Sequence, residues 1–90
     1  MENFKTMYGV EYFNQRTESG NFDIFETLEA ARDFIKSEKF RTTFILFYIF
    51  KADFNTEHIY QSQDGSWNYF NVSDLYQNDE ELLLPKNFLD

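Results

Sequence analysis

The sequence contains no cysteine, one proline, one histidine and three glycines among its 90 residues. Without cysteine the chain has no disulfide, no thiolate metal ligand and no cysteine nucleophile, and it suits a reducing compartment. Three glycines are too few for a phosphate-binding loop of the Rossmann or P-loop kind. These absences remove most of the common cofactor-binding motifs, and we expect no cofactor.

The single histidine and the serines form no recognisable catalytic motif. His58 has no cysteine to activate, and nothing marks Ser62, Ser66 or Ser73 as a nucleophile on a glycine-flanked elbow. We therefore expect His58 to be a surface or strand-edge residue. The sixteen acids lack the spacing of an EF-hand or a zinc site, and no pair of them is singled out for acid–base chemistry. The sequence thus predicts no metal and no enzymatic activity.

Long hydrophobic runs are missing as well. The longest, residues 44–50, is far shorter than the roughly 20 residues that cross a bilayer as a helix. Residues 1–12 lack the basic and apolar regions of a signal peptide. We expect no membrane partner and a location in the cytoplasm, which is the host cytoplasm if the gene belongs to a phage.

Basic residues are outnumbered two to one, with 8 Lys and Arg against 16 Asp and Glu and a net charge of −8. Direct nucleic-acid binding is disfavoured, because its affinity comes largely from Lys and Arg contacts with phosphates. The same charge attracts a basic protein surface, such as a groove that itself holds DNA or RNA. It is also compatible with a charge that only keeps the protein soluble.

Aromatic residues are plentiful, with 12 Phe, 6 Tyr and 1 Trp. Each buries roughly 150–250 Å², so one small domain spanning residues 1–90 can form a core without disulfide bonds or structural metal ions.

The period-two pattern predicts strands over residues 4–14 and 21–25, joined by a polar turn. Thr27 stands where an N-cap would, and a helix is predicted from Leu28 to about Glu38. Residues 42–54 are predicted to form a central strand that is apolar on both faces. The fold class expected is α+β, an antiparallel sheet of four to five strands with one principal helix packed on one face.

Uninterrupted alternation would divide the side chains of the central strand between two faces. One set is Phe44, Leu46, Tyr48, Phe50 and Phe54, and the other is Ile45, Phe47 and Ile49. One set meets the helix, and the second set must meet another layer. We expect a homodimer or a partner that covers Ile45, Phe47 and Ile49.

Asp64-Gly65 predicts a hairpin with a two-residue type I′ turn. The register that follows places Tyr60 opposite Tyr69 and gathers Tyr60, Trp67 and Tyr69 on one face. Three interpretations of this cluster stay open: a stacking platform for a ligand, a contact for a protein partner, or packing within the molecule.

Residues 71–90 form an acidic C-terminal segment. Its charged residues are Asp74, Asp79, Glu80, Glu81, Lys86 and Asp90. Leucines 82–84 follow the acidic run, and Pro85 prevents a helix there. The segment is predicted either to pack over the core or to extend freely.

Residues 8–76 resemble small early proteins of phages and prophages of AT-rich Gram-positive bacteria. The likeness rests on the strand-helix-strand-strand order, on the segment FETLEAARDFIKS and on the segment HIYQSQDGSWNYFNVSDLY. The resemblance implies a role in host takeover or counter-defence, as in anti-CRISPR and anti-restriction proteins, many of which imitate DNA with carboxylates.

The function expected is therefore that of a non-enzymatic inhibitor of phage type. It would occupy a basic, nucleic-acid-binding site of a bacterial defence protein such as a CRISPR effector. The contact residues expected are Trp67, Tyr69, Asp74, Tyr76, Asp79, Glu80 and Glu81. The alternative is a small structural or accessory module that forms a homodimer through its sheet face.

Overall fold

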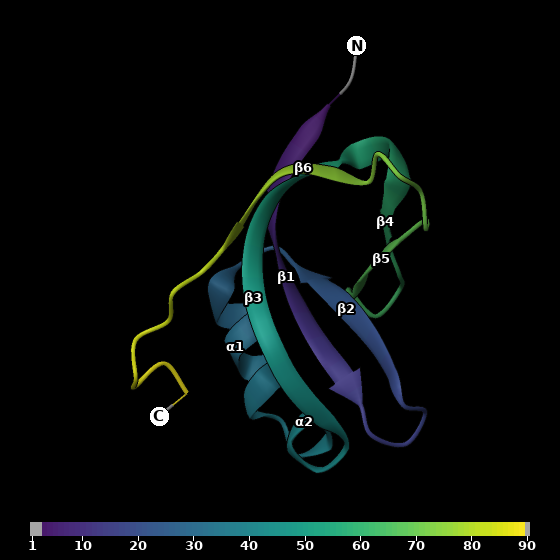
Figure 1. Cartoon of the computed structure of the whole chain (residues 1–90). Coiled ribbons are helices and arrows are strands. Elements are labelled where there is room, and N and C mark those ends of the chain that lie inside the picture. The colour runs from purple at the N-terminus through teal and green to yellow at the C-terminus, as the bar shows by residue number, and fades with distance from the viewer. Residues whose placement is uncertain (1–2, 90) are drawn as a thin grey trace.

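A six-stranded antiparallel sheet carries two helices on one face in the computed structural model, which describes residues 3–89 (Figure 1). The α+β class is confirmed, but the expected four to five strands and single principal helix are too few. The strand order is β4-β5-β2-β1-β3-β6. The elements are β1 Phe4–Asn14, β2 Ser19–Phe25, α1 Leu28–Lys36, α2 Glu38–Thr43, β3 Phe44–Asn55, the 3-10 turn η1 Thr56–His58, β4 Ile59–Gln61, β5 Trp67–Tyr69 and β6 Tyr76–Glu81.

Thr27 caps α1 as predicted, because its hydroxyl accepts a hydrogen bond from the Ala30 amide at 3.1 Å. The helix ends earlier than expected, at Ser37, whose backbone is extended. The Ser37 hydroxyl then accepts from the Phe40 amide at 3.2 Å and caps α2. One residue thus ends the first helix and begins the second. None of the helices in residues 3–89 is long and apolar enough to cross a membrane.

A bulge in β3 lies opposite Glu11 of β1. Glu11 pairs with Tyr48, whereas the next residue of β1 pairs with Leu46, so Phe47 is an extra residue in β3. The extra residue reverses the alternation beyond it. Leu46 and Ile49 both belong to the helix-side core, while Phe47 and Tyr48 lie on the face without helices. The predicted uninterrupted division of β3 side chains is therefore wrong, and Ile49 is fully buried, with 0% exposure.

The sheet separates two apolar cores. The helix-side core contains Val10, Tyr12, Ala31, Ile35, Phe40 and Ile49. The core on the other face contains Met7, Ile24, Phe50, Ala52, Phe54, Ile59 and Leu75. Phe22 of β2 contacts Tyr76 of β6, with ring centroids 6.2 Å apart, although β2 and β6 are not neighbours in the sheet. The sheet therefore curls, and its outer strands cover one half of the helix-free face.

The C-terminal segment packs over the core, which decides between its two predicted arrangements: Leu75 and Tyr76 lie on the helix-free face, and residues 82–88 run along the helix side of the sheet. Leu82, Leu84 and Phe88 contact the helix-side core, and the Leu82 amide donates to the Ile49 carbonyl at 2.9 Å. Leu83 between them is 96% exposed.

Candidate functional site

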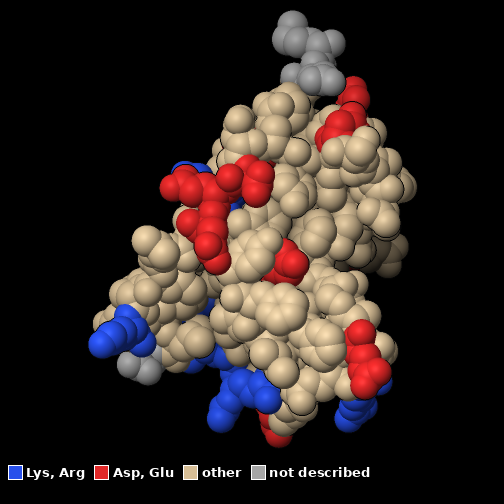
Figure 2. All heavy atoms as spheres, in the orientation of Figure 1, with Lys and Arg blue, Asp and Glu red and all other residues tan. Residues whose placement is uncertain are grey.

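The edge strand β6 carries three consecutive exposed carboxylates, Asp79, Glu80 and Glu81, which we call the acidic edge. Glu80 pairs with Lys51 of β3, and Glu81 pairs with Phe50. Figure 2 shows acidic side chains gathered over the end of β6, at upper left. The acidic edge therefore keeps its three charges at the surface.

Asn78 fixes the beginning of the acidic edge. Its backbone φ of 57° is a left-handed conformation that Asn tolerates better than most residues. The side-chain amide of Asn78 donates to the Asp53 carboxylate at 3.1 Å, and this carboxylate also accepts from the Thr6 hydroxyl at 2.9 Å. These two hydrogen bonds lower the pKa of Asp53. The pairing of β3 with β6 shifts register here, and such irregularities hinder the addition of a further strand. Pairing with an additional strand is therefore disfavoured at this edge.

An exposed apolar residue stands directly after the acidic edge. Leu83 points outward, while its neighbours Leu82 and Leu84 are half-buried against the helix-side core. The edge thus combines carboxylates, which steer association, with an apolar group that a partner can bury.

Two of the other expected contact residues lie near β6 but differ in accessibility. Asp74 is exposed in the preceding loop, with its carboxylate 3.2 Å from Nε2 of His58. Tyr76 packs on Phe54, with ring centroids 5.1 Å apart. Burial, and then the charge of Asp79, raise the pKa of Tyr76. Tyr76 therefore lies beside the acidic edge, whereas Asp74 is paired with His58.

The β4–β5 hairpin has a different register from the one predicted. The Gly65 amide donates to the Ser62 carbonyl at 3.0 Å, and the Ser62 amide donates to the Ser66 carbonyl at 2.8 Å. Gly65 has a φ of 89° and is the one loop residue with positive φ, so the loop has three residues rather than two. Ile59 pairs with Tyr69, one position away from expectation.

This shift overturns the predicted aromatic cluster, because a slip of one residue moves side chains to the opposite face. Tyr60 pairs with Asn68 and contacts the exposed Phe70, with ring centroids 5.2 Å apart. Trp67 and Tyr69 instead pack against the core of the helix-free face.

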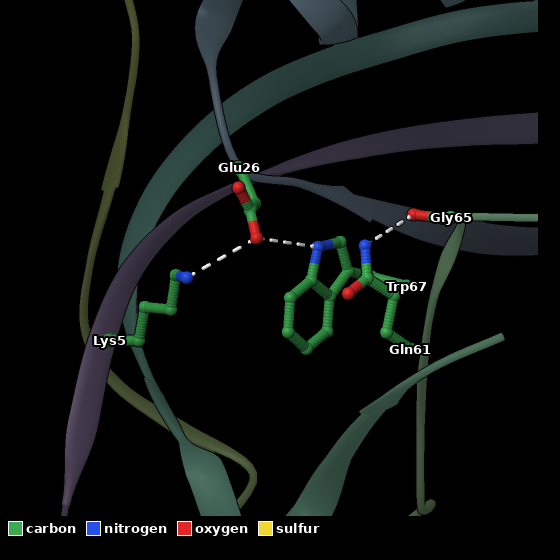
Figure 3. Close-up of polar contacts among 5 residues, drawn as sticks. All are labelled: Lys5, Glu26, Gln61, Gly65 and Trp67. Atoms are coloured by element: carbon green, nitrogen blue, oxygen red, sulfur yellow. Dashed lines mark hydrogen bonds and ion pairs between the residues drawn. The ribbon is translucent and has the colours of Figure 1, made fainter. Parts of the chain in front are cut away.

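Trp67 and Tyr69 are held by contacts within the molecule. The indole N–H of Trp67 donates to Glu26 at 3.1 Å, and Lys5 binds the same carboxylate oxygen at 3.2 Å (Figure 3). The Lys5 ammonium also lies 5.3 Å from the centre of the Trp67 ring. Tyr69 stacks on Phe22, with centroids 4.4 Å apart and planes within 6°. Among the three interpretations of these aromatics, packing within the molecule describes what their side chains do.

A groove of about 690 Å³ lies between α1 and the β4–β5 hairpin, with residues of β2 as its floor. Asp23 lines it and accepts a hydrogen bond from the Tyr12 hydroxyl at 3.2 Å. Burial raises the pKa of Asp23, and burial followed by the charge of Asp23 raises that of Tyr12 well above its usual value. Across residues 3–89, no three His, Asp or Glu side chains are grouped so as to hold a metal ion.

The helix-free face carries an exposed apolar surface that was predicted only in part: Ile45 and Phe47 were expected there, together with Ile49, which is buried. It consists of the exposed Ile45, Phe47 and Tyr48 and the half-buried Phe13, which we call the open-face patch. Phe13 and Phe47 are in contact, with ring centroids 6.2 Å apart. Glu11 lies opposite Tyr48. A hydrogen bond with Glu11, followed by burial and the Glu11 charge, raises the pKa of Tyr48 to about 12.

Comparisons with protein-family models, with curated proteins and with solved structures find no match to this chain.

Proposed function

We propose that the protein acts by binding another protein, and that the acidic edge is the contact that recognises a basic site on it. The observation that carries this proposal is the run of three exposed carboxylates on an edge strand, followed by the exposed Leu83. In line with the resemblance of residues 8–76, the partner is a bacterial protein whose basic surface holds nucleic acid, such as a CRISPR effector.

Electrostatics supports this assignment. Exposed charges of one sign accelerate encounter with an oppositely charged surface, while buried apolar groups slow dissociation. Eight bases are interspersed with the sixteen acids, so the charge of the whole surface does not imitate a nucleic acid. The imitation is local and concentrated on β6.

A triple variant tests the acidic edge. We expect Asp79→Asn, Glu80→Gln and Glu81→Gln together to slow association with a purified CRISPR effector by about 10-fold, equivalent to about 1.4 kcal/mol. The dependence of the association rate on salt should also become flatter. Surface plasmon resonance at several salt concentrations measures both effects. The fold should be unchanged, because exposed charges contribute little to stability.

A second triple variant supplies the control. Glu29→Gln, Asp33→Asn and Glu57→Gln remove the same number of charges from exposed positions on α1 and η1, and this variant should associate nearly as fast as the natural sequence. Equal losses from both variants would show that net charge, and not the acidic edge, is responsible. Binding that is unaffected by the first variant would overturn the role of the edge.

Asp74 is tested separately, because its carboxylate lies beside His58 and not on β6. Asp74→Asn should leave association almost unchanged. A loss as large as that of the triple variant would extend the contact surface to the loop before β6.

A further inference from the structure

The open-face patch is an exposed apolar surface that the proposed function does not use. Ile45 is 49% exposed and Phe47 is 54% exposed. Both lie on the helix-free face, where Tyr48 is also exposed and Phe13 is half-buried. Apolar and aromatic side chains that adjoin one another in water mark an interaction site.

No element within residues 3–89 covers the patch. Both helices and residues 82–88 pack on the opposite face of the sheet. On the helix-free face, the side chains of β4, β5 and β6 belong to the core around Phe50 and Phe54, toward the other end of β3. Phe47 therefore leaves water only if another molecule covers it.

A carboxylate borders this apolar surface on the same face of the sheet. Glu11 stands two residues before Phe13 in β1, so both side chains point to the helix-free face. It lies opposite Tyr48, whose hydroxyl donates a hydrogen bond to it. Among the described residues Glu11 has no ion-pair partner.

The position of Glu11 restricts what can cover the patch. A molecule that covers Tyr48 also covers Glu11, and a buried carboxylate is costly unless a positive charge pairs with it. The occupant must therefore bring a lysine or an arginine together with its apolar side chains. A second copy of this chain does not meet this requirement by pairing patch to patch, because the patch holds no basic residue to place on Glu11.

The patch also continues into the acidic edge. Tyr48 contacts Phe50, with ring centroids 6.0 Å apart, and Phe50 pairs with Glu81 of β6. Figure 1 views the sheet from its helix-free face, with α1 behind β3. In the same orientation, Figure 2 shows the acidic side chains over β6 next to a largely uncharged area. One partner surface can therefore contact the edge and the patch together.

We propose that the open-face patch is the apolar centre of the contact that the acidic edge begins, and that the same basic protein covers it and places a lysine or arginine on Glu11. This assignment rests on the proposed function, to which it adds a second contact surface. Protein interfaces commonly have an apolar centre and a charged or polar rim. Here the acidic edge is the rim that governs association, and the patch governs dissociation.

Surface plasmon resonance with the purified CRISPR effector tests the patch. Phe47→Ser and Ile45→Ser should each raise the dissociation rate by about 10-fold or more, because an anchoring side chain is lost from the centre of the contact. The association rate should change little. Phe70→Ser is the matched control, since Phe70 is 53% exposed but lies outside the patch, beside Tyr60, and this variant should dissociate as slowly as the natural sequence. Circular dichroism confirms that each variant is folded.

Glu11→Gln tests the paired charge. The substitution keeps the size of the side chain and removes its charge, and it should raise the dissociation rate by about 10-fold, as expected for one partner of a buried charge pair. Glu29→Gln on α1 removes one charge far from the patch and should have no such effect. Faster dissociation of Phe47→Ser without any effect of Glu11→Gln would overturn the pairing of a basic group with Glu11.

The remaining outcomes separate failure of the patch from failure of the proposed function. If the triple variant of the acidic edge slows association while Phe47→Ser, Ile45→Ser and Glu11→Gln all dissociate at the natural rate, the proposed function stands and the patch has no part in the contact. If the natural sequence does not bind, both fall. Sedimentation velocity of the purified chain completes the test, because a dimer that Phe47→Ser disrupts would identify a second copy as the occupant and overturn the proposal.

Discussion

The ring of Phe50 on β3 lies over Gly9 on β1, in the space that a Cβ at residue 9 would fill. The absence of a side chain at Gly9 is thus what allows Phe50 to enter the core of the helix-free face. We expect Gly9→Ala to lower the free energy of unfolding by about 1–3 kcal/mol, because the ring must leave its preferred position. Denaturant unfolding measures the change.

Gly20→Ala is the matched control, since Gly20 also lies in a strand and a Cβ there would meet nothing closer than the Tyr12 carbonyl oxygen at 4.0 Å. Equal stability losses in the two variants would show that the entropy of glycine, rather than the Phe50 contact, determines the result at Gly9.

Local signals in the sequence were sufficient for most elements of the fold. Alternation located β1, and the hydroxyl of Thr27 located the start of α1, because both depend on neighbours in the chain. The bulge at Phe47 gave no such signal, since every residue from 44 to 50 is apolar or aromatic and fits either face. Strand β6 was missed for a related reason. Its acidic residues are poor strand formers, and they are extended because they pair with β3.

The conformation of Gly65 determines the hairpin loop. Its φ of 89° is accessible to glycine but strained for a β-branched residue. Gly65→Val should therefore destabilise the protein by about 1–3 kcal/mol, whereas Gly65→Asn should have a smaller effect because Asn tolerates positive φ better. Thermal unfolding of the two variants provides the comparison, and an unchanged midpoint for Gly65→Val would contradict this loop geometry.

The sequence predicted the exposed carboxylates of the candidate site but not the arrangement of the aromatic residues in the hairpin. Asp64-Gly65 indicates a turn in either register, and the sequence alone does not distinguish a two-residue loop from a three-residue loop. The choice decides which face Tyr60 occupies, and with it the membership of any aromatic cluster. The carboxylates of β6 are different. Charged side chains stay exposed whether the C-terminal segment packs on the core or extends freely. The exposure of Asp79, Glu80 and Glu81 could therefore be predicted without knowing that they lie in a strand.

The contact between Glu11 and Tyr48 predicts a dependence on alkaline pH. Tyr48 has a pKa of about 12 in the folded protein against an ordinary value of 10.0. The folded state therefore holds a proton that the unfolded state releases in this interval. The contribution of Tyr48 to stability is complete below about pH 10 and is lost as the pH rises toward 12.

Glu11→Gln should lower the pKa of Tyr48 toward its ordinary value, because the carboxylate is the largest cause of the shift and also acts through its charge. Absorbance near 295 nm during an alkaline titration should show one tyrosine ionising at lower pH than in the natural sequence. Glu29→Gln on α1 is the control and should leave the titration curve unchanged. An unchanged curve for Glu11→Gln would mean that the hydrogen bond to Tyr48 does not form in solution.

Asn78 should control how firmly the acidic edge is held against β3. Asn78→Val combines a β-branched side chain with a φ of 57° and loses the hydrogen bond to Asp53, so we expect a loss of about 1–3 kcal/mol in stability. Asn78→Gly loses the hydrogen bond but keeps the backbone conformation, and its effect should be smaller.

Hydrogen exchange at the Leu82 amide reports the pairing directly, because this amide donates to the Ile49 carbonyl at 2.9 Å. Faster exchange should appear in Asn78→Val and to a lesser degree in Asn78→Gly. If both variants exchange at the rate of the natural sequence, β6 is held by the packing of Leu82 and Leu84, and the conformation of Asn78 has no part in positioning the acidic edge.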